Sequence, residues 1–507
     1  TATAAPPDPG WLADRLEHAV GDGGYRHLVA WQHAADQGDG TRSVGTEGFR
    51  RSADYLVSQL RGAGYRVTRQ VVPFQRFRID SEHAELTGTG TAADTEPVQV
   101  LMSPWAVGTP EGGVTAPVVA LPDTRDGQPV PDAGCSADDY AGLPVAGAIV
   151  IAPRATCGFV GQQTVAAGLG ARAVLSYLLT PRPDNIYRVQ VFTPEQVHIP
   201  MGMVSQRVGE RLAAAEPGSV SLHLELRATV VDATTENILA QTAGGRTDRV
   251  VLAGAHLDSV SEGPGIDDNA TSAAAMLQIA LRLAPYQHRV TNAVRFAWWG
   301  AEELIDVGSG RYVDSLDQRQ RDDIALYLNA EVIAAPNFAR FVMDGDDSDH
   351  PGTGSGPAPA GSGAVEAVLA GYYASRHLAY ETQDLSNIGS DHEPFAAAGI
   401  PVGGIDGGTI QLKTAAQAQR YGGQAGQMFD SCYHQSCDDL ANVDRPELAR
   451  NAGALAFTVG RFALDVGDVT ASRSPSPPRP TADPSDHTGT RGTPPAGRTA
   501  TGPGAGR

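Results

Sequence analysis

From about residue 236 onward, apolar runs typical of β-strands alternate with segments of helical periodicity. Residues 249–255, 293–298 and 324–330 are strand-like, whereas 272–284 and 447–464 are helix-like. Strands buried on both faces read as continuous apolar runs, and alternation with helices at this spacing is typical of a parallel sheet. The pattern therefore predicts an α/β fold, in which a mostly parallel sheet is flanked by helices.

The chain of 507 residues is too long for one ordinary compact domain. We expect the catalytic part of the sheet domain at 227–467 and its N-terminal part at 11–96, where 47–63 predicts an amphipathic helix before an extended run. Residues 97–226 have short β-rich runs, many Gly and Pro and few charges, which predicts an inserted β-rich domain. Residues 468–507 are rich in Ser, Pro and Gly with almost no apolar side chains, so we expect a disordered tail.

The charge balance disfavours nucleic acid as a partner. The 58 acidic residues outnumber the 38 Lys and Arg, giving a formal charge of −20. No cluster of Lys and Arg forms a local basic patch that could bind the phosphate backbone. No run of 18 apolar residues predicts a membrane span. The chain begins at Thr1 without an apolar signal segment, as expected for a secreted, extracellular protein whose signal peptide has been removed. Nothing in the sequence defines an oligomeric state.

The four cysteines fall into two close pairs, Cys135 with Cys157 and Cys432 with Cys437. An even number and local pairing favour two disulfides formed in an oxidising compartment. The alternative is a zinc cluster of Cys432, His434 and Cys437. A structural zinc normally takes four such ligands, and no second pair lies nearby.

Candidate metal ligands follow three consecutive strands of the predicted sheet. In such sheets, functional groups collect beyond the carboxyl ends of the strands. Imidazole and carboxylate groups are zinc ligands, and five of them can hold two ions about 3.5–4 Å apart if one carboxylate bridges. A glutamate adjacent to a glutamate ligand would remain free as a general base. The residues at these strand ends and in the loops after them are His256, Asp258, Asp267, Asp268, Glu302, Glu303 and Glu331. One more histidine, His434, lies between Cys432 and Cys437.

Each of these residues has a simpler interpretation when taken alone. His256 would be a hydrogen-bonded or surface histidine that binds no metal. Glu302 and Glu303 would be the solvated start of a helix, and Asp267 and Asp268 would form a turn. Their coincidence at the ends of three strands favours the metal site. The sequence lacks an H-E-x-x-H motif, a G-x-S-x-G elbow and a Walker A loop.

Five segments resemble the motifs of a known family, the secreted bacterial di-zinc aminopeptidases of the leucyl-aminopeptidase type. The segments are GAHLDSV (254–260), GPGIDDNA (263–270), FAWWGAEEL (296–304), SDHEPF (390–395) and CYHQSCD (432–438). The resemblance implies a zinc-dependent enzyme that hydrolyses peptide substrates from the N-terminus. It also implies two Zn²⁺ per chain, one held by His256, Asp268 and Glu331 and the other by Asp268, Glu303 and His434. A calcium ion is compatible with the sequence, but no motif supports one.

The same resemblance implies roles for three further residues. Glu302 would be the general base, Tyr433 would donate a hydrogen bond to the oxyanion, and Asp258 would orient His256. It also implies a cis peptide bond between Asp268 and Asn269. Residues 134–159 resemble part of a protease-associated domain, which is non-catalytic.

The sequence departs from the family at two positions. Glu331 stands where the family usually has Asp, and Ile388-Gly389 stands where members often read Gly-Arg. The alternatives are another di-zinc exopeptidase or amidohydrolase, or a catalytically dead receptor-like homologue. All the ligand positions and the position of the base hold side chains that can bind zinc or accept a proton, which argues against a catalytically dead receptor-like homologue.

Overall fold

The computed structural model describes residues 10–88, 95–125, 128–189, 191, 196–351 and 356–472. None of the helices in these segments is both long enough and apolar enough to cross a membrane.

The strand–helix alternation forms the predicted sheet. In spatial order its strands are β15 (Glu381–Gln383), β14 (Phe341–Met343), β16 (Val402–Asp406), β13 (Ile324–Glu331), β11 (Arg246–His256), β12 (Asn292–Trp299) and β10 (Val220–Gln241). The four central strands β16, β13, β11 and β12 pair in parallel, whereas β14 and β10 pair antiparallel with their neighbours. The predicted α/β class with a mostly parallel sheet is confirmed.

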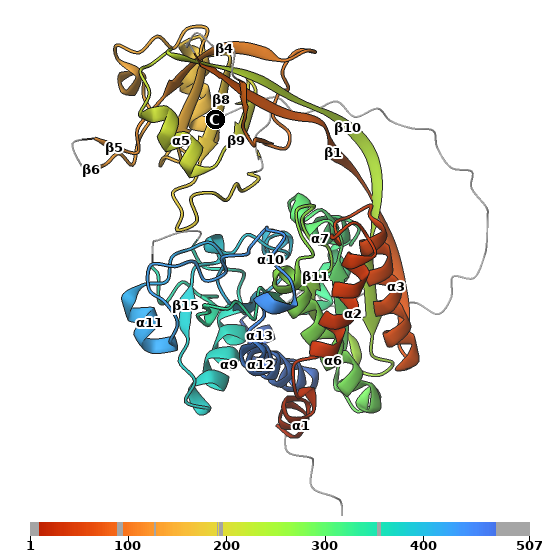
Figure 1. Ribbon diagram of the computed structural model, residues 1–507. Helices are drawn as coiled ribbons and strands as arrows, with labels where there is room; N and C mark the ends of the chain where they lie inside the picture. The colour runs from red at the N-terminus through yellow and green to blue at the C-terminus, as the bar shows by residue number, and fades with distance from the viewer. Residues whose placement is uncertain are drawn as a thin grey trace, which may run out of the picture. The chain divides into compact units, whose positions relative to one another are not determined.

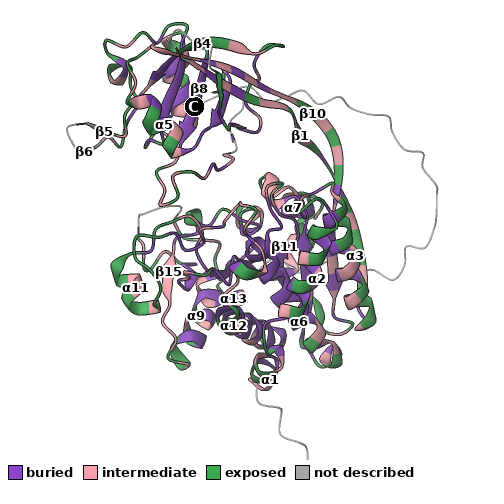
Figure 2. Ribbon diagram, in the orientation of Figure 1, coloured by how far each residue is buried: buried purple, intermediate pink, exposed green. Residues whose placement is uncertain are grey.

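Helices cover both faces of this sheet (Figure 1). Successive side chains of a strand point to opposite faces. Accordingly Val251, Ala253 and Ala255 of β11 enter the larger core, whereas Leu252 enters the smaller one. Buried residues gather on the sheet and on the helix sides that face it (Figure 2). The larger core includes side chains of α1 (Trp11–Val20), α2 (Tyr25–Asp36), α3 (Glu47–Gly62), α6 (Ser272–Leu283), α9 (Ser362–Ser375), α12 (Arg445–Leu464) and α13 (Gly467–Ala471). The smaller core includes α7 (Val307–Asp314) and α10 (His392–Ala397), and two further helices are α8 (Gln318–Asp322) and α11 (Ala415–Tyr421).

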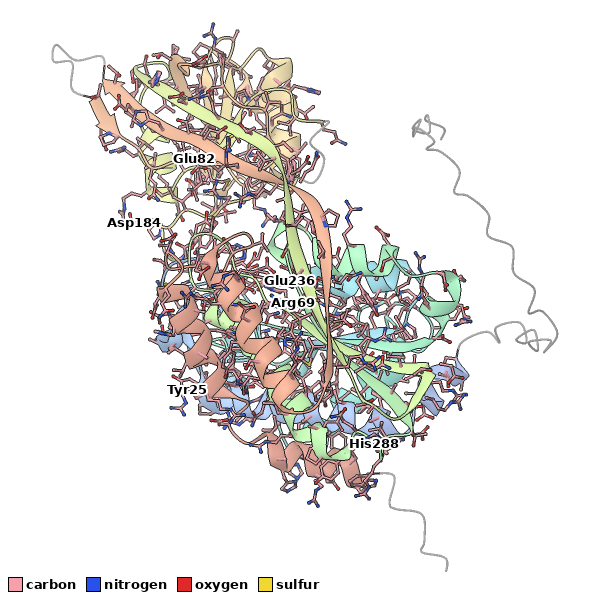
Figure 3. The ribbon with its side chains drawn as sticks, turned by 90° about the vertical axis from the view of Figure 1, so that its right-hand side faces the viewer. Tyr25, Arg69, Glu82, Asp184, Glu236 and His288 are labelled. Carbon is pink, nitrogen blue, oxygen red and sulfur yellow. A yellow bond between two sulfur atoms is a disulfide. The ribbon has the colours of Figure 1, made fainter. Side chains whose placement is uncertain are left out.

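Two long strands connect the sheet to the insert. β1 (Arg66–Gly88) pairs antiparallel with β10 from Arg66↔Gln241 to Gly88↔Val220, with an irregularity at Ile79/Ser81. Arg69 and Glu236 form an ion pair across this ribbon (Figure 3). One end of β10 pairs with β12 and the other end pairs with β4 of the insert. The extended run that the sequence predicts at 65–74, after the helix at 47–63, is therefore much longer in the structure. Strand β10 also passes through the predicted domain boundary at 226.

The insert is built around short strands, as its composition predicted. Its strands β4, β7, β8 and β9 pair in parallel. Alternate residues of β7 enter two different cores. Ile149 and Ile151 enter one of them, and Val150 and Ala152 enter the other. The elements are β2 (Thr95–Pro97), β3 (Leu101–Met102), β4 (Val114–Ala120), β5 (Thr124–Arg125), β6 (Gln128–Pro129), β7 (Ile149–Pro153), α4 (Gly158–Gly168), β8 (Ala173–Tyr177), β9 (Met201–Met203) and α5 (Gln206–Ala213).

The predicted tail differs from the structure at its start. Helix α13 (Gly467–Ala471) occupies its first residues, and Val469 is buried in the larger core. The remainder, from residue 473, lies outside the described residues.

Candidate metal centre

The predicted ligands come from the carboxyl ends of three central strands and from two loops. His256 ends β11 and Glu331 ends β13, whereas Glu303 lies in the short helical turn (Glu302–Leu304) after β12. Asp268 lies in the turn (Ile266–Thr271) that leads into α6. His434 follows Cys432 in a loop closed by a disulfide.

These five residues form two groups that share Asp268. One comprises His256, Asp268 and Glu331, the other Asp268, Glu303 and His434, and within each group the donor atoms lie within 4.8 Å of one another. Asp268 Oδ1 lies 3.4 Å from His256 Nε2, and Asp268 Oδ2 lies 3.2 Å from His434 Nε2. The two oxygens of one carboxylate thus face two different imidazoles, which is the arrangement needed for a bridging ligand.

The spacing of the donor atoms fits zinc. His256 Nε2 lies 3.2 Å from Glu331 Oε1, and His434 Nε2 lies 3.1 Å from Glu303 Oε2. Two ligand atoms, each about 2.0–2.1 Å from one zinc ion at the tetrahedral angle, are about 3.3 Å apart. His434 Nε2 is buried and makes no hydrogen bond within the described part of the chain, although two carboxylates adjoin it. A metal ion between these atoms would account for both observations.

The electrostatics of the cluster also favour bound cations. Burial raises the pKa of Glu303 to about 7, and burial also raises the pKa of Glu302 well above its ordinary value. Burial alone would lower the pKa of His256, but the carboxylates of Glu302 and Glu331 outweigh it and raise that pKa. Buried carboxylates at this density are costly unless positive charge balances them. Two divalent ions would supply that charge.

Glu331, the longer side chain at a position where Asp was expected, is held by a neighbour. Its Oε1 faces His256, while its Oε2 accepts a hydrogen bond of 2.5 Å from Ser390 Oγ. Ser390 Oγ in turn accepts a hydrogen bond from Asn329 Nδ2. The additional methylene of Glu331 is thereby accommodated with one oxygen directed at the metal group.

Asp258 connects two of the strand ends. Its carboxylate lies 3.7 Å from His256 Nδ1, while the backbone oxygen of Asp258 is closer, at 3.1 Å. The carboxylate oxygens accept the backbone N–H groups of Glu302 and Glu303 at 3.1 and 3.4 Å. Asp258 therefore fixes the turn that carries the two adjacent glutamates, in addition to its position beside the imidazole.

Tyr433 and Glu302 border the same small cavity. Glu302 Oε2 lies 3.5 Å from His256 Nε2, and the ring of Tyr433 stacks on that of His434 with centroids 3.9 Å apart. A cavity of about 70 Å³ adjoins Asp268, Glu302, Glu331 and Tyr433. The peptide bond between Asp268 and Asn269 is cis, as predicted.

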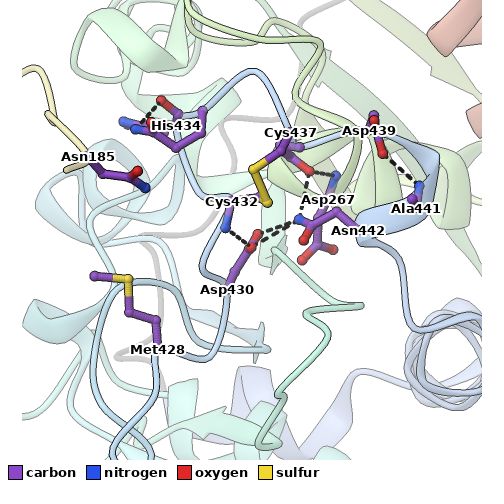
Figure 4. Close-up of a disulfide and its surroundings, with 12 residues drawn as sticks. Asn185, Asp267, Met428, Asp430, Cys432, His434, Cys437, Asp439, Ala441 and Asn442 are labelled. Carbon is purple, nitrogen blue, oxygen red and sulfur yellow. Dashed lines mark hydrogen bonds between the residues drawn. A yellow bond between two sulfur atoms is a disulfide. The ribbon is translucent and has the colours of Figure 1, made fainter. Parts of the chain in front are cut away.

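Sequence reasoning did not identify two residues that hold the loops of the site. The carboxylate of Asp438 accepts the backbone N–H groups of Asp267 and Asp268 at 2.8 and 3.0 Å, and Asn442 Nδ2 donates to it. Asn442 also donates to Asp430, beside the Cys432–Cys437 disulfide (Figure 4). Asp438 ends the CYHQSCD segment, so its place in a motif was a usable signal. Arg42 is fully buried and donates to the backbone oxygens of Leu257, Pro264 and Gly265, and no motif indicated it.

Both predicted disulfides are present. Cys135 pairs with Cys157 and Cys432 with Cys437, with Cα atoms 5.7 and 5.3 Å apart. The alternative zinc cluster at Cys432 and Cys437 is therefore wrong. The second disulfide closes the loop that presents Tyr433 and His434, where His434 has a positive φ of 57°.

We expect the two disulfides to contribute differently to stability and activity. The stabilisation from closing a loop grows with its length, and the sequence separations are 22 and 5 residues. The C432A/C437A variant should therefore lose more kcat/KM than C135A/C157A, and its melting temperature should fall less. Thermal unfolding and steady-state kinetics of both variants test this, and the reverse order of the two effects would contradict it.

Comparison with known proteins identifies the family. Residues 237–459 match the model described as peptidase family M28, and residues 114–212 match the PA domain. The chain is 39% identical over 447 residues to the probable lipoprotein aminopeptidase LpqL of Mycobacterium tuberculosis, covering 87% of this chain and 84% of that protein. The chain belongs to peptidase family M28. As a member, it is a hydrolase with a PA domain inserted within the predicted range 97–226.

Two further similarities agree with this family. The chain is 35% identical over 444 residues to an aminopeptidase of Pseudomonas aeruginosa, covering 87% of this chain and 80% of that protein. A zinc aminopeptidase from Bacillus subtilis superposes with a TM-score of 0.62 over 88% of this chain and 94% of that one, at 20% sequence identity. The second similarity shows that this chain and the Bacillus subtilis enzyme share a fold.

Proposed function

We propose that this M28 protein is a zinc-dependent aminopeptidase that hydrolyses the first peptide bond of its substrates at a centre of two zinc ions. The observation that carries the proposal is the position of Asp268, whose two oxygens face His256 and His434. Relatives from Mycobacterium tuberculosis and Pseudomonas aeruginosa that carry the name aminopeptidase support the same activity.

The proposed ligand sets are His256, Asp268 and Glu331 for one ion and Asp268, Glu303 and His434 for the other. Bound zinc ions would polarise the scissile carbonyl and lower the pKa of the attacking water. Glu302, beside the cluster but outside both sets, accepts a proton from that water and delivers it to the amine nitrogen that leaves. Tyr433 donates a hydrogen bond to the oxygen on which negative charge develops.

We further propose that the protein acts outside the cytoplasm. Its two disulfides persist in oxidising compartments, and the Mycobacterium tuberculosis relative is named a lipoprotein.

A panel of aminoacyl-nitroanilides and their N-acetylated counterparts tests the activity. We expect hydrolysis of the free-amine substrates, loss of that activity after chelation, and recovery on adding zinc. Metal analysis of the purified protein should give two zinc ions per chain. Equal hydrolysis of N-acetylated substrates would contradict an aminopeptidase, and purification without zinc would favour a receptor-like protein.

A further inference from the structure

Under the proposed function, the N-terminal residue of a substrate lies in the cavity of about 70 Å³ beside the metal group. Its lining includes Glu302 and Tyr433, the proposed base and the proposed oxyanion donor. A second hollow, of about 160 Å³, reaches Glu303 and His434 but neither of those two residues. Because the scissile carbonyl has to lie between Glu302 and Tyr433, the residue before that bond occupies the smaller cavity.

The lining of this cavity also includes a buried carboxylate. Asp406 is the last residue of β16 and is only 5% exposed. It lies in register with Glu331 on the parallel neighbour β13, and side chains in register point to the same face of a sheet. On its other side β14 places Phe341 in register with it. The two strand neighbours of Asp406 are thus a second carboxylate and an apolar ring.

Asp406 lacks a cationic partner of its own. Its Oδ1 accepts the backbone N–H of Gly408 at 2.9 Å, and no Lys, Arg or His within the described ranges forms an ion pair with it. Gly389, another wall residue, has no side chain, and a Cβ built there would meet only Glu393 Oε1, at 4.0 Å. Asp406 therefore adjoins open space without a cation of its own, and a positive group that entered this space could pair with it.

Three further lining residues are suited to a polar group. Asn387, Thr409 and Gln411 also line the cavity, and each has a side-chain oxygen that can accept a hydrogen bond. Gln411 Oε1 already accepts from the N–H and the hydroxyl of Thr409. An ammonium or guanidinium group could in addition donate to the hydroxyl oxygen of Thr409 and to the amide oxygen of Asn387.

The strand order determines which substrate group reaches Asp406. Glu331 on β13 already faces His256, whereas β16 is one strand further from β11 and the metal group. Neighbouring strands lie about 4.8 Å apart. A group that pairs with Asp406 therefore lies about one strand spacing further from the metal group than Glu331 does, which suits the end of a side chain better than the α-amine.

We propose that Asp406 selects substrates whose N-terminal residue has a cationic side chain, lysine or arginine. This assignment rests on the proposed aminopeptidase function. Asp406 pairs with the ammonium or guanidinium group, while the polar wall accepts its remaining N–H donors.

The test compares kcat/KM for Lys-, Arg-, Met- and Leu-nitroanilide with the zinc-loaded full chain. Methionine is close to lysine in length but uncharged. We expect lysine and arginine to exceed methionine and leucine by about 10-fold or more, as for a site built to bind a polar group. Asp406→Asn should lower the Lys-to-Met ratio by at least about 10-fold, and Asp406→Glu should retain a ratio above one.

The control variant is Asp468→Asn, which removes one exposed negative charge from α13 and should keep the wild-type ratio. Inhibition of the wild-type enzyme by free lysine and by norleucine gives a readout that needs no variant. Lysine should inhibit at a concentration at least about 10-fold lower than norleucine does.

The outcomes separate this inference from the proposed function. If no free-amine substrate is hydrolysed, the proposed function fails. If Met- and Leu-nitroanilide are hydrolysed as well as Lys-nitroanilide, or norleucine inhibits as well as lysine, only the inference fails. An unchanged Lys-to-Met ratio in Asp406→Asn would likewise overturn the role of Asp406.

Discussion

Replacing Glu302 by glutamine is expected to lower kcat by about 10²–10⁴-fold, the usual contribution of a positioned general base, while two zinc ions remain bound. The substitution keeps the shape of the side chain and its backbone N–H, which donates to Asp258 Oδ1. It removes only the ability to accept a proton. Because Glu302 belongs to neither donor group, metal content should not change.

The adjacent residue is the matched control. Glu303 Oε2 lies 3.1 Å from His434 Nε2, so Glu303→Gln should weaken one zinc site and lower the zinc content to about one per chain. Metal analysis of both variants after the same dialysis, together with kcat, tests this division of roles. Equal zinc loss in the two variants would refute it.

The ends of the central strands were the predictable part of the site. His256 and Glu331 each follow a continuous apolar run, and the parallel pairing of these runs brings their ends together. His434 was predicted from its motif and not from periodicity, because its loop belongs to no strand. Its position depends on the short disulfide-closed loop, which the close spacing of Cys432 and Cys437 did indicate.

The long β1–β10 ribbon was not predictable from hydrophobic periodicity. Strand patterns are read from one buried face, but beyond Phe74 most residues of β1 are exposed or half-buried. Arg76, Arg78, Asp80 and Glu82 consequently gave a polar stretch that does not resemble a core strand. Backbone pairing with β10 maintains this segment as a strand.

Arg42 was not predicted for a different reason, because its role depends only on tertiary contacts with distant loops. The oxygens that accept from its guanidinium belong to Leu257, Pro264 and Gly265, more than 200 residues away in the sequence. Burial lowers the pKa of Arg42 to about 10, opposed mainly by the nearby Asp438 carboxylate, so the group remains protonated at neutral pH. A single cation thus ties the loop after His256 to the loop before Asp268.

Arg42→Met is therefore expected to destabilise the protein by about 3–5 kcal/mol, because it leaves three buried carbonyl oxygens without donors at about 1–3 kcal/mol each. The melting temperature should fall by about 3–5 °C, because the entropy of unfolding of a chain of this length is about 1 kcal/mol/K. Arg42→Lys keeps the charge but cannot match the fork of donors, so an intermediate decrease is expected. Arg50→Met on α3, where the arginine side chain is 57% exposed, is the control and should change the melting temperature by no more than about 2 °C.

Arg42→Met should also bind zinc more weakly, because His256 and Asp268 lose the link between their loops. Thermal unfolding with and without excess zinc separates the two effects: a decrease that zinc abolishes would mean that Arg42 acts only through metal binding, and a melting temperature equal to that of Arg50→Met would remove it from the site altogether.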